Sequence, residues 1–128
     1  MNIYHITSRE AWIDATRRGI YAAPSLETEG FIHCSTAAQV LPVARSYFAG
    51  QTGLVLLVID TEHLDSELKW EISAPPSGIA DDATFPHVYG PISLESVLRT
   101  VELETNKNGQ FIMPKLAATN DAPPRSLR

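Results

Sequence analysis

The chain has 128 residues, of which 44% are hydrophobic and 20% are charged. This length and balance suit one folded domain and exclude collagen-like, coiled-coil and wholly disordered proteins. The 10 basic and 15 acidic residues give a formal net charge of −5 with neutral histidines. Such a chain has no general attraction to nucleic-acid backbones or anionic membranes, so we do not expect nucleic acid as a partner, while small anionic ligands are not excluded.

Three features favour a cytoplasmic protein without a membrane segment. The N-terminus carries His5, Arg9 and Glu10 where a signal peptide would need an apolar stretch. The single cysteine excludes an internal disulfide framework. The longest apolar run, Leu54–Ile59, is far too short to span a membrane.

The first half of the chain alternates strands with a helix. Asn2–Thr7 predicts a strand, because its apolar residues favour extended backbone. Thr7 and Glu10 have capping-box spacing and predict a helix that begins there and stops at Gly19. We then expect a short strand, a polar connection and another short strand, over Ile20–Ala23, Pro24–Gly30 and Phe31–Cys34.

The second half holds one more helix and then mostly strands. Thr36 and Gln39 repeat the capping-box spacing and open an amphipathic segment that ends at Gly50. Pro42 inside this segment predicts a kink or a late helix start. Leu54–Ile59 is rich in Val, Ile and Leu, so we expect a strand buried on both faces. We then expect a strand over Lys69–Ile72 and a long loop over Ser73–Thr84. A proline-flanked turn over Phe85–Pro91 and a final turn with a strand over Leu94–Leu103 should follow.

This order of elements predicts an α+β fold. Strands and helices alternate at first and strands dominate later, which favours a small mixed, bent and split β-sheet flanked by two helices. We expect a single α+β domain over residues 1–113. The polar segment Ala117–Arg128 contains two prolines, and we expect residues 114–128 to form a disordered tail.

Three histidines stand at comparable places in this plan. His5 lies in the first strand, His33 near the end of the Phe31–Cys34 strand, and His87 in the proline-flanked turn. Histidine titrates near neutral pH, donates and accepts hydrogen bonds, and ligates metals. Each one alone has an ordinary explanation as a half-buried, hydrogen-bonded side chain. Three together favour one shared polar site, because sites form at strand ends and loop mouths.

The run Gly30–Thr36 is the most informative stretch. His33 and Ser35 point to one face by the period-two rule, and Ser35 and Thr36 precede a predicted helix, whose N-terminus favours an anion such as a phosphate. The simpler alternative is an ordinary N-cap. Cys34 should face the other way as a buried, inert thiol. The alternative is an exposed Cys–His nucleophile with a lowered pKa.

A second group of candidates lies later in the chain. His87 and Tyr89 share a face between two prolines that fix the backbone, unless this is a structural turn with a packed tyrosine. Glu71 lies in the preceding strand, where it could orient a ribose hydroxyl, stabilise a developing cation or simply face solvent. Since no HxH or HxxxH spacing occurs, a histidine metal site has weak support. Walker A, G-x-G-x-x-G and G-x-S-x-G motifs are also missing from the sequence.

Together these motifs resemble a known family. The residues that carry the resemblance are Ile3–Thr7, Gly30–Thr36 with Gln39, Trp70-Glu71 and Phe85–Pro91. Over roughly residues 2–104 the chain is similar to the bacterial domain-of-unknown-function 952 family. That family is similar in fold to the ADP-ribosyltransferases, and closest to their RNA 2′-phosphotransferase branch. The resemblance therefore implies an ADP-ribosyltransferase-like fold and NAD as a candidate cofactor.

The resemblance also implies roles for particular residues. His5 would hydrogen-bond a ribose of NAD, the run from His33 to Ser35 would line the nicotinamide pocket, and Glu71 would match a third-strand glutamate. With the strand pattern added, the candidate catalytic residues are His5, His33, Glu71 and His87. The candidate cofactor-binding residues are His5, His33, Ser35 and Tyr89.

Three functions follow as hypotheses. The first is an NAD-using transferase that breaks the nicotinamide–ribose bond through an oxocarbenium-like transition state stabilised by polar groups in a cleft. The second is a non-catalytic binding module for a nucleotide or another small molecule, and the third is a histidine metal site. A small molecule or nucleotide is thus the expected partner. For gripping phosphate, Arg9 and Arg45 are the candidates.

Overall fold

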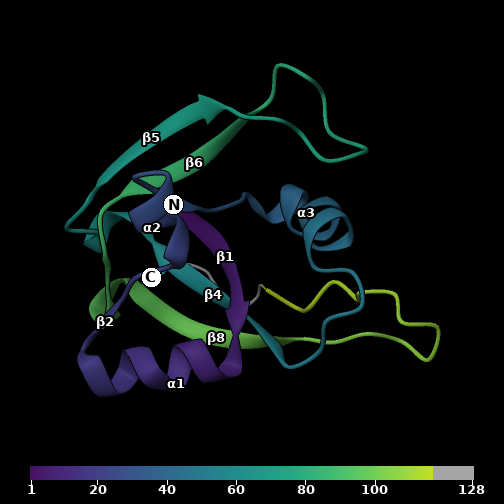
Figure 1. Ribbon diagram of the computed structural model, residues 1–128, viewed down its shortest axis with the longest axis horizontal. Helices are drawn as coiled ribbons and strands as arrows, with labels where there is room; N and C mark the ends of the chain where they lie inside the picture. Colours follow the sequence, from purple (N-terminus) through teal and green to yellow (C-terminus); the bar gives the residue numbers. More distant parts are fainter. Residues whose placement is uncertain (117–128) are drawn as a thin grey trace, which may run out of the picture.

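The computed structural model describes residues 1–116, and its centre is a three-stranded sheet in the order β1–β4–β8 (Figure 1). These strands are Asn2–Ser8, Leu54–Asp60 and Val97–Leu103. The middle strand β4 alternates its side chains between two apolar clusters, one with Val55, Leu57 and Ile59 and the other with Leu54, Leu56 and Val58. The predicted burial of this run on both faces is confirmed.

One helix covers each face of this sheet. α1 (Arg9–Arg18) contributes Ala15 to the first cluster, and α3 (Val40–Tyr47) contributes Val40 and Ala44 to the second. Figure 1 shows the two helices well apart, with β1 running between them. The prediction of two flanking helices is confirmed, but a third helix, α2 (Pro24–Thr28), replaces the expected polar connection. A proline at the first helical position favours this start, because its missing N–H has no partner there anyway.

Two smaller sheets complete the fold. The first has the order β3–β6–β5, and the second pairs β2 with β7. All pairings among these strands and in the central sheet are antiparallel, so the expected mixed sheet is wrong, whereas the α+β class and the division of the sheet are confirmed. The strands are β2 (Ile20–Tyr21), β3 (Ile32–His33), β5 (Glu67–Ile72), β6 (Thr84–Tyr89) and β7 (Ile92–Ser93), and short 3-10 turns lie at Ala37–Gln39, Thr61–His63 and Leu94–Ser96.

The start of α1 differs by one residue from the prediction. Ser8 is the N-cap and its side chain accepts a hydrogen bond from the Ala11 backbone N–H at 3.0 Å, while Thr7 belongs to β1. Both residue types can cap a helix, so the sequence alone did not separate them. The helix stops at Gly19 as predicted, in the left-handed conformation (φ 83°) that glycine adopts at little cost.

The second predicted capping box is present. Thr36 and Gln39 exchange both hydrogen bonds of the box and open the 3-10 turn that leads into α3. Pro42 lies in the first turn of α3, where backbone N–H groups have no helical partner, and the late helix start is thereby confirmed. α3 ends at Tyr47, before the predicted stop at Gly50.

The segment predicted as a proline-flanked turn is a strand instead. β6 lies in the middle of its sheet and places His87 between His33 on β3 and Lys69 on β5. Pro86 is tolerated because its missing N–H faces Cys34, just beyond the end of β3, and its carbonyl accepts from the Cys34 N–H at 3.0 Å. The ladder with β5 therefore needs no N–H from this residue.

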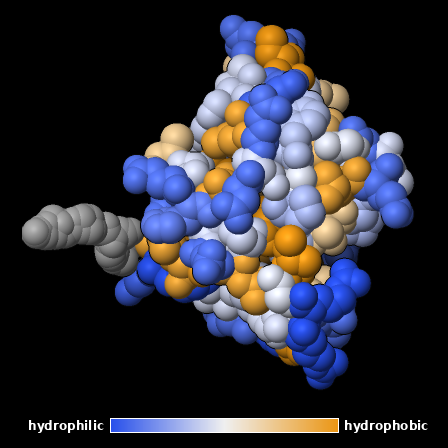
Figure 2. All heavy atoms as spheres, turned by 90° about the vertical axis from the view of Figure 1, so that its left-hand side faces the viewer, coloured by the Kyte–Doolittle hydropathy of each residue, from blue (hydrophilic) through white to orange (hydrophobic). Residues whose placement is uncertain are grey.

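The surface is mixed in character. On the face shown in Figure 2, hydrophobic residues gather in small groups separated by hydrophilic ones. Exposed large apolar side chains include Ile72 and Leu98. Single exposed apolar residues are common on protein surfaces. Within residues 1–116, no helix is long and apolar enough to cross a bilayer. Of the predicted tail, residues 117–128 lie outside the described part of the chain.

Candidate functional site

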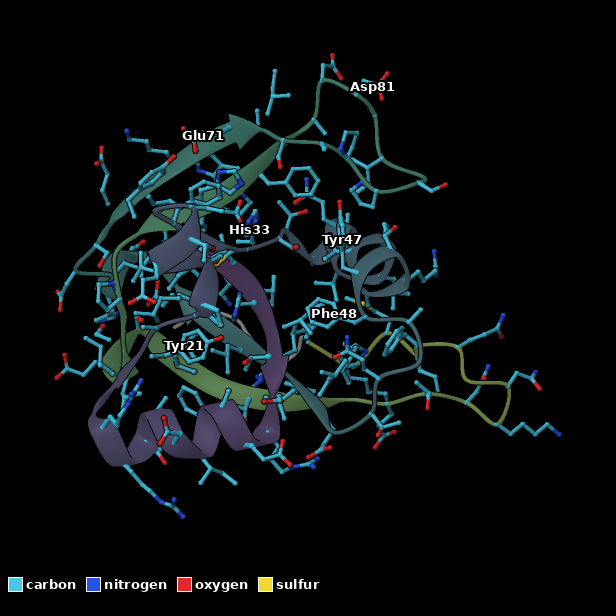
Figure 3. All side chains as sticks on the ribbon, viewed as in Figure 1. Tyr21, His33, Tyr47, Phe48, Glu71 and Asp81 are labelled. Carbon is cyan, nitrogen blue, oxygen red and sulfur yellow. The ribbon has the colours of Figure 1, made fainter. Side chains whose placement is uncertain are left out.

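A cleft of about 720 Å³ runs beside β1. Because β1 is an outer strand of its sheet, residues from both of its faces reach the cleft, among them Tyr4 and His5. His33, from β3, and Tyr47, from α3, also line the cleft, and both are labelled in Figure 3. The long loop between β5 and β6 contributes residues 73, 74 and 76. This volume lies within the range of known small-molecule sites.

Both ring nitrogens of His5 are held by the protein. Nδ1 lies 2.6 Å from the carbonyl oxygen of His33, and Nε2 lies 2.7 Å from the hydroxyl of Tyr21. A carbonyl oxygen only accepts, so Nδ1 carries the hydrogen of a neutral ring and Nε2 accepts from Tyr21. The Tyr21 hydroxyl also shares a hydrogen bond with Thr7 Oγ1 at 3.0 Å.

This network is uncharged at neutral pH. Burial lowers the pKa of His5 from 6.5 to about 4, and the hydrogen bond to the His33 carbonyl offsets only part of that effect. Burial also raises the pKa of the Tyr21 hydroxyl. A ribose hydroxyl could reach a ring nitrogen of His5 only by displacing Tyr21 or the His33 carbonyl. The role implied for His5 by the resemblance therefore stays a prediction.

Glu71, His87 and Tyr89 form a second group, on β5 and β6. Glu71 Oε1 accepts from His87 Nδ1 at 2.8 Å and from the Tyr89 hydroxyl at 2.6 Å. The hydrogen bond from Tyr89 lowers the pKa of the Glu71 carboxyl most, and the bond from His87 lowers it further. The bond to Glu71 raises the pKa of Tyr89. The ammonium of Lys69 lies 4.7 Å from the centre of the Tyr89 ring. The predicted placement of His87 and Tyr89 on one face is confirmed.

The other ring nitrogen of His87 has no partner among the described residues. His87 is 2% exposed, and its Nε2 is buried without a hydrogen bond. Since Glu71 accepts the hydrogen on Nδ1, a neutral ring would carry no proton on Nε2. Phe31 stacks on the ring with centroids 4.1 Å apart, and the His33 ring meets it at a steep angle with centroids 5.3 Å apart.

His33 joins the two groups. Its backbone carbonyl holds His5, and its ring contacts His87. Its Nε2 lies 3.1 Å from the carboxylate of Glu29, and both of these side chains are about half exposed. His33 also lines the cleft.

The structure therefore brings the predicted residues together only in part. His5, His33 and Ser35 line the cleft, whereas the second group of Glu71, His87 and Tyr89 does not. In Figure 3 Glu71 lies on β5, away from Tyr47 and the α3 side of the cleft.

Of the two alternatives for the Ser35–Thr36 segment, the geometry favours the ordinary cap over the anion site. Ser35 is buried and pairs with Tyr4 through two backbone hydrogen bonds of 2.7 and 2.8 Å, so its N–H is already used. The N-cap is Thr36, and the helical element it caps is a 3-10 turn of three residues. An ordinary cap, the simpler alternative, accounts for this segment.

Cys34 is a buried thiol, as expected, but it lines the cleft together with His33 and Ser35, whereas alternation predicted that it faces away from them. It is 3% exposed, belongs to an apolar cluster, and burial raises the pKa of its thiol well above the ordinary value. Arg9, a candidate for gripping phosphate, is paired with Glu102, and neither Arg9 nor Arg45 lines the cleft. Among residues 1–116, no three His, Cys, Asp or Glu side chains are placed to hold a metal ion.

Several residues of the site were not found by sequence reasoning. Tyr21 followed a helix stop without any motif of its own, and Glu29 lay inside the supposed polar connection. Tyr47 did carry a signal, the apolar face of the amphipathic segment, but that pattern indicated core packing. The structure leaves Tyr47 57% exposed at the cleft, its hydroxyl 3.4 Å from the Ala74 carbonyl.

Comparisons with known proteins point to one family. The family described as "Protein of unknown function (DUF952)" matches residues 6–100. The crystal structure of protein CC0527 from Caulobacter crescentus is similar, with 35% identity, a TM-score of 0.75, and coverage of 88% of this chain and 94% of that chain. Its solution NMR structure gives 35% identity, a TM-score of 0.70, and coverage of 85% and 90%. No curated protein matches the chain.

Proposed function

Because the chain belongs to the DUF952 family of proteins of unknown function, as its motifs indicated, we propose a function from the cleft itself: it binds a small, ring-containing organic molecule. The observation that carries this proposal is the cleft of about 720 Å³ with its mainly apolar walls. Aromatic side chains stand on several of its sides, namely Tyr4, Tyr47, Phe48 and Phe85. Small-molecule sites are typically built in this way, with a few polar groups that fix orientation.

Polar groups reach the cleft from several elements, including His5, Thr7, Ser8, Gln51 and Ser73, and one set lies near β3 and α2. His33, Ser35, Ser25 and Glu29 supply hydroxyls, an imidazole and a carboxylate there. Among the described residues that line the cleft, none is lysine or arginine. A pyrophosphate would thus be bound without the basic side chains that usually neutralise it.

The NAD-using transferase is the second candidate. It rests on the fold similarity that the resemblance implies and on the placement of His5, His33 and Ser35 along one cleft. Under this proposal the nicotinamide ring would occupy the aromatic part of the cleft. The nicotinamide–ribose bond of NAD would break, nicotinamide would leave, and the ADP-ribosyl group would pass to an acceptor nucleophile or to water. The binding module would bind the ring and release nothing.

An NMR titration with nicotinamide as the probe tests the binding function. At millimolar nicotinamide, a concentration suited to so small a ligand, we expect shifts of the backbone amide signals of His33, Ser35 and Tyr47. Tyr47→Ala should weaken binding, while Trp70→Ala, which removes an exposed aromatic ring outside the cleft, should not. An unchanged spectrum, or equal loss in both variants, would overturn the proposal. Incubation with NAD then separates the candidates, since only the transferase releases nicotinamide.

A further inference from the structure

The charges around the cleft are one-sided. Glu29 is the one Asp or Glu among the described residues that line it, and no lysine or arginine accompanies it there. We propose that the cleft selects a cationic ring compound over a neutral or an anionic one, with Glu29 as the residue that sets this preference. The inference rests on the proposed binding function and names its ligand class.

Glu29 is placed to meet a ligand. It is the residue that ends α2, and the next residue, Gly30, turns the chain at φ 92° into β3. Its side chain is 50% exposed, and Oε1 is engaged by His33 Nε2 at 3.1 Å. A carboxylate has two oxygens with about four acceptor sites, so this contact leaves acceptor capacity for a ligand cation.

The aromatic walls act in the same direction. The faces of Tyr and Phe rings carry negative charge density and attract a cation. Tyr47 is more than half exposed and lines the same cleft as His33 and Glu29. A planar cation between these walls would gain from the ring faces and from Glu29 together. An anion would be repelled by the ring faces and by the Glu29 carboxylate.

Among the described residues that line the cleft, no lysine or arginine offsets this preference. The backbone N–H of Ser35, beside the predicted helix N-terminus, is bonded to the Tyr4 carbonyl. Arg9 is paired with Glu102 outside the cleft. Glu29 therefore sets the preference, and the aromatic walls of the cleft act in the same direction.

Three probes of one shape and three charges test the inference. Nicotinamide is neutral, 1-methylnicotinamide is a cation and nicotinate is an anion at pH 8, where an ordinary imidazole is neutral. We expect the cation to bind at least about fivefold more tightly than nicotinamide, and nicotinate at least about fivefold more weakly. Glu29→Gln should reduce the preference for the cation to less than about twofold.

Glu27→Gln is the matched control. Glu27 lies on the same helix, is exposed and does not line the cleft, so this variant changes the net charge equally and should keep the preference. If nicotinamide binds but the cation binds no more tightly, or if both variants lose the preference equally, the inference is wrong while the binding function stands. If none of the three probes binds, the binding function itself fails.

Discussion

Acid should destabilise this protein through His5, well before its carboxylates become protonated. The ring is buried and neutral, with a pKa of about 4 in the folded chain against about 6.5 when unfolded. Between these values the unfolded chain binds more protons, so the stability contributed by neutral His5 is complete above pH 6.5 and is lost as the pH falls towards 4. A pKa difference of about 2.5, at about 1.36 kcal/mol per unit, corresponds to about 3 kcal/mol, of which about 2 kcal/mol is lost by pH 5.

Urea unfolding at pH 7.5 and at pH 5 measures this loss. The free energy of unfolding of the wild type should fall by about 2 kcal/mol more than that of His5→Gln, which has no imidazole to titrate at this position. Nitrogen-15 NMR of the folded wild type gives the pKa of His5 directly and decides the question even if the variant does not fold. A pKa of 6 or higher for His5 in the folded protein would refute the reasoning.

Three further changes test individual contacts. Tyr21→Phe removes the hydroxyl that satisfies the buried His5 Nε2 and should lower the free energy of urea unfolding by about 1–3 kcal/mol. Glu71→Gln removes the charged acceptor of the His87 Nδ1 hydrogen, so nitrogen-15 spectra should show a mixture of ring tautomers in place of one. Cys34 is buried, and Ellman's reagent at pH 8 should react with it about 10³-fold more slowly in folded than in unfolded protein.

Each of these has a control or a contrary outcome. Tyr47→Phe also removes a tyrosine hydroxyl, but an exposed one, and should change the free energy of unfolding by less than about 0.5 kcal/mol. Equal losses in the two Tyr→Phe variants would contradict the importance of the contact with His5. Glu67→Gln, on the same strand as Glu71, should leave the His87 tautomer unchanged. Rapid labelling of Cys34 in the folded state would mean that the cleft wall opens there.

The sequence predicted those parts of the fold that local chemistry decides. The stop at Gly19, the capping box at Thr36 and the buried run Leu54–Ile59 each depend on a few neighbouring residues, and the structure has all three. Strand pairing depends on distant residues and was less accessible. Pro86 indicated a turn by every local rule, yet β3 and β5 flank it and hold it in a strand, because its missing N–H falls where no bond to β5 is required.

The candidate site shows the same division. Residue type and alternation were enough to single out the three histidines and to place His87 and Tyr89 on one face. They could not show that His87 pairs across the sheet with Lys69 and takes Glu71 as its partner, since that follows from the register of β5 against β6. The pairing of His5 with Tyr21 joins β1 to β2 across sheets, and no local pattern records it.

The His5–Tyr21 network and the Glu71–His87–Tyr89 group contact different atoms of His33, so a ligand can disturb one contact without the other. His5 holds the backbone carbonyl of His33, whereas Glu29 and His87 contact only its ring. A cation bound at Glu29 would compete with the ring nitrogen for the carboxylate and leave the backbone contact intact. We therefore expect 1-methylnicotinamide to shift the ring signals of His33 and His87 in nitrogen-15 spectra while the signals of His5 stay in place. Shifts confined to His5 would mean that the ligand enters from the Tyr21 side and that Glu29 does not guide it.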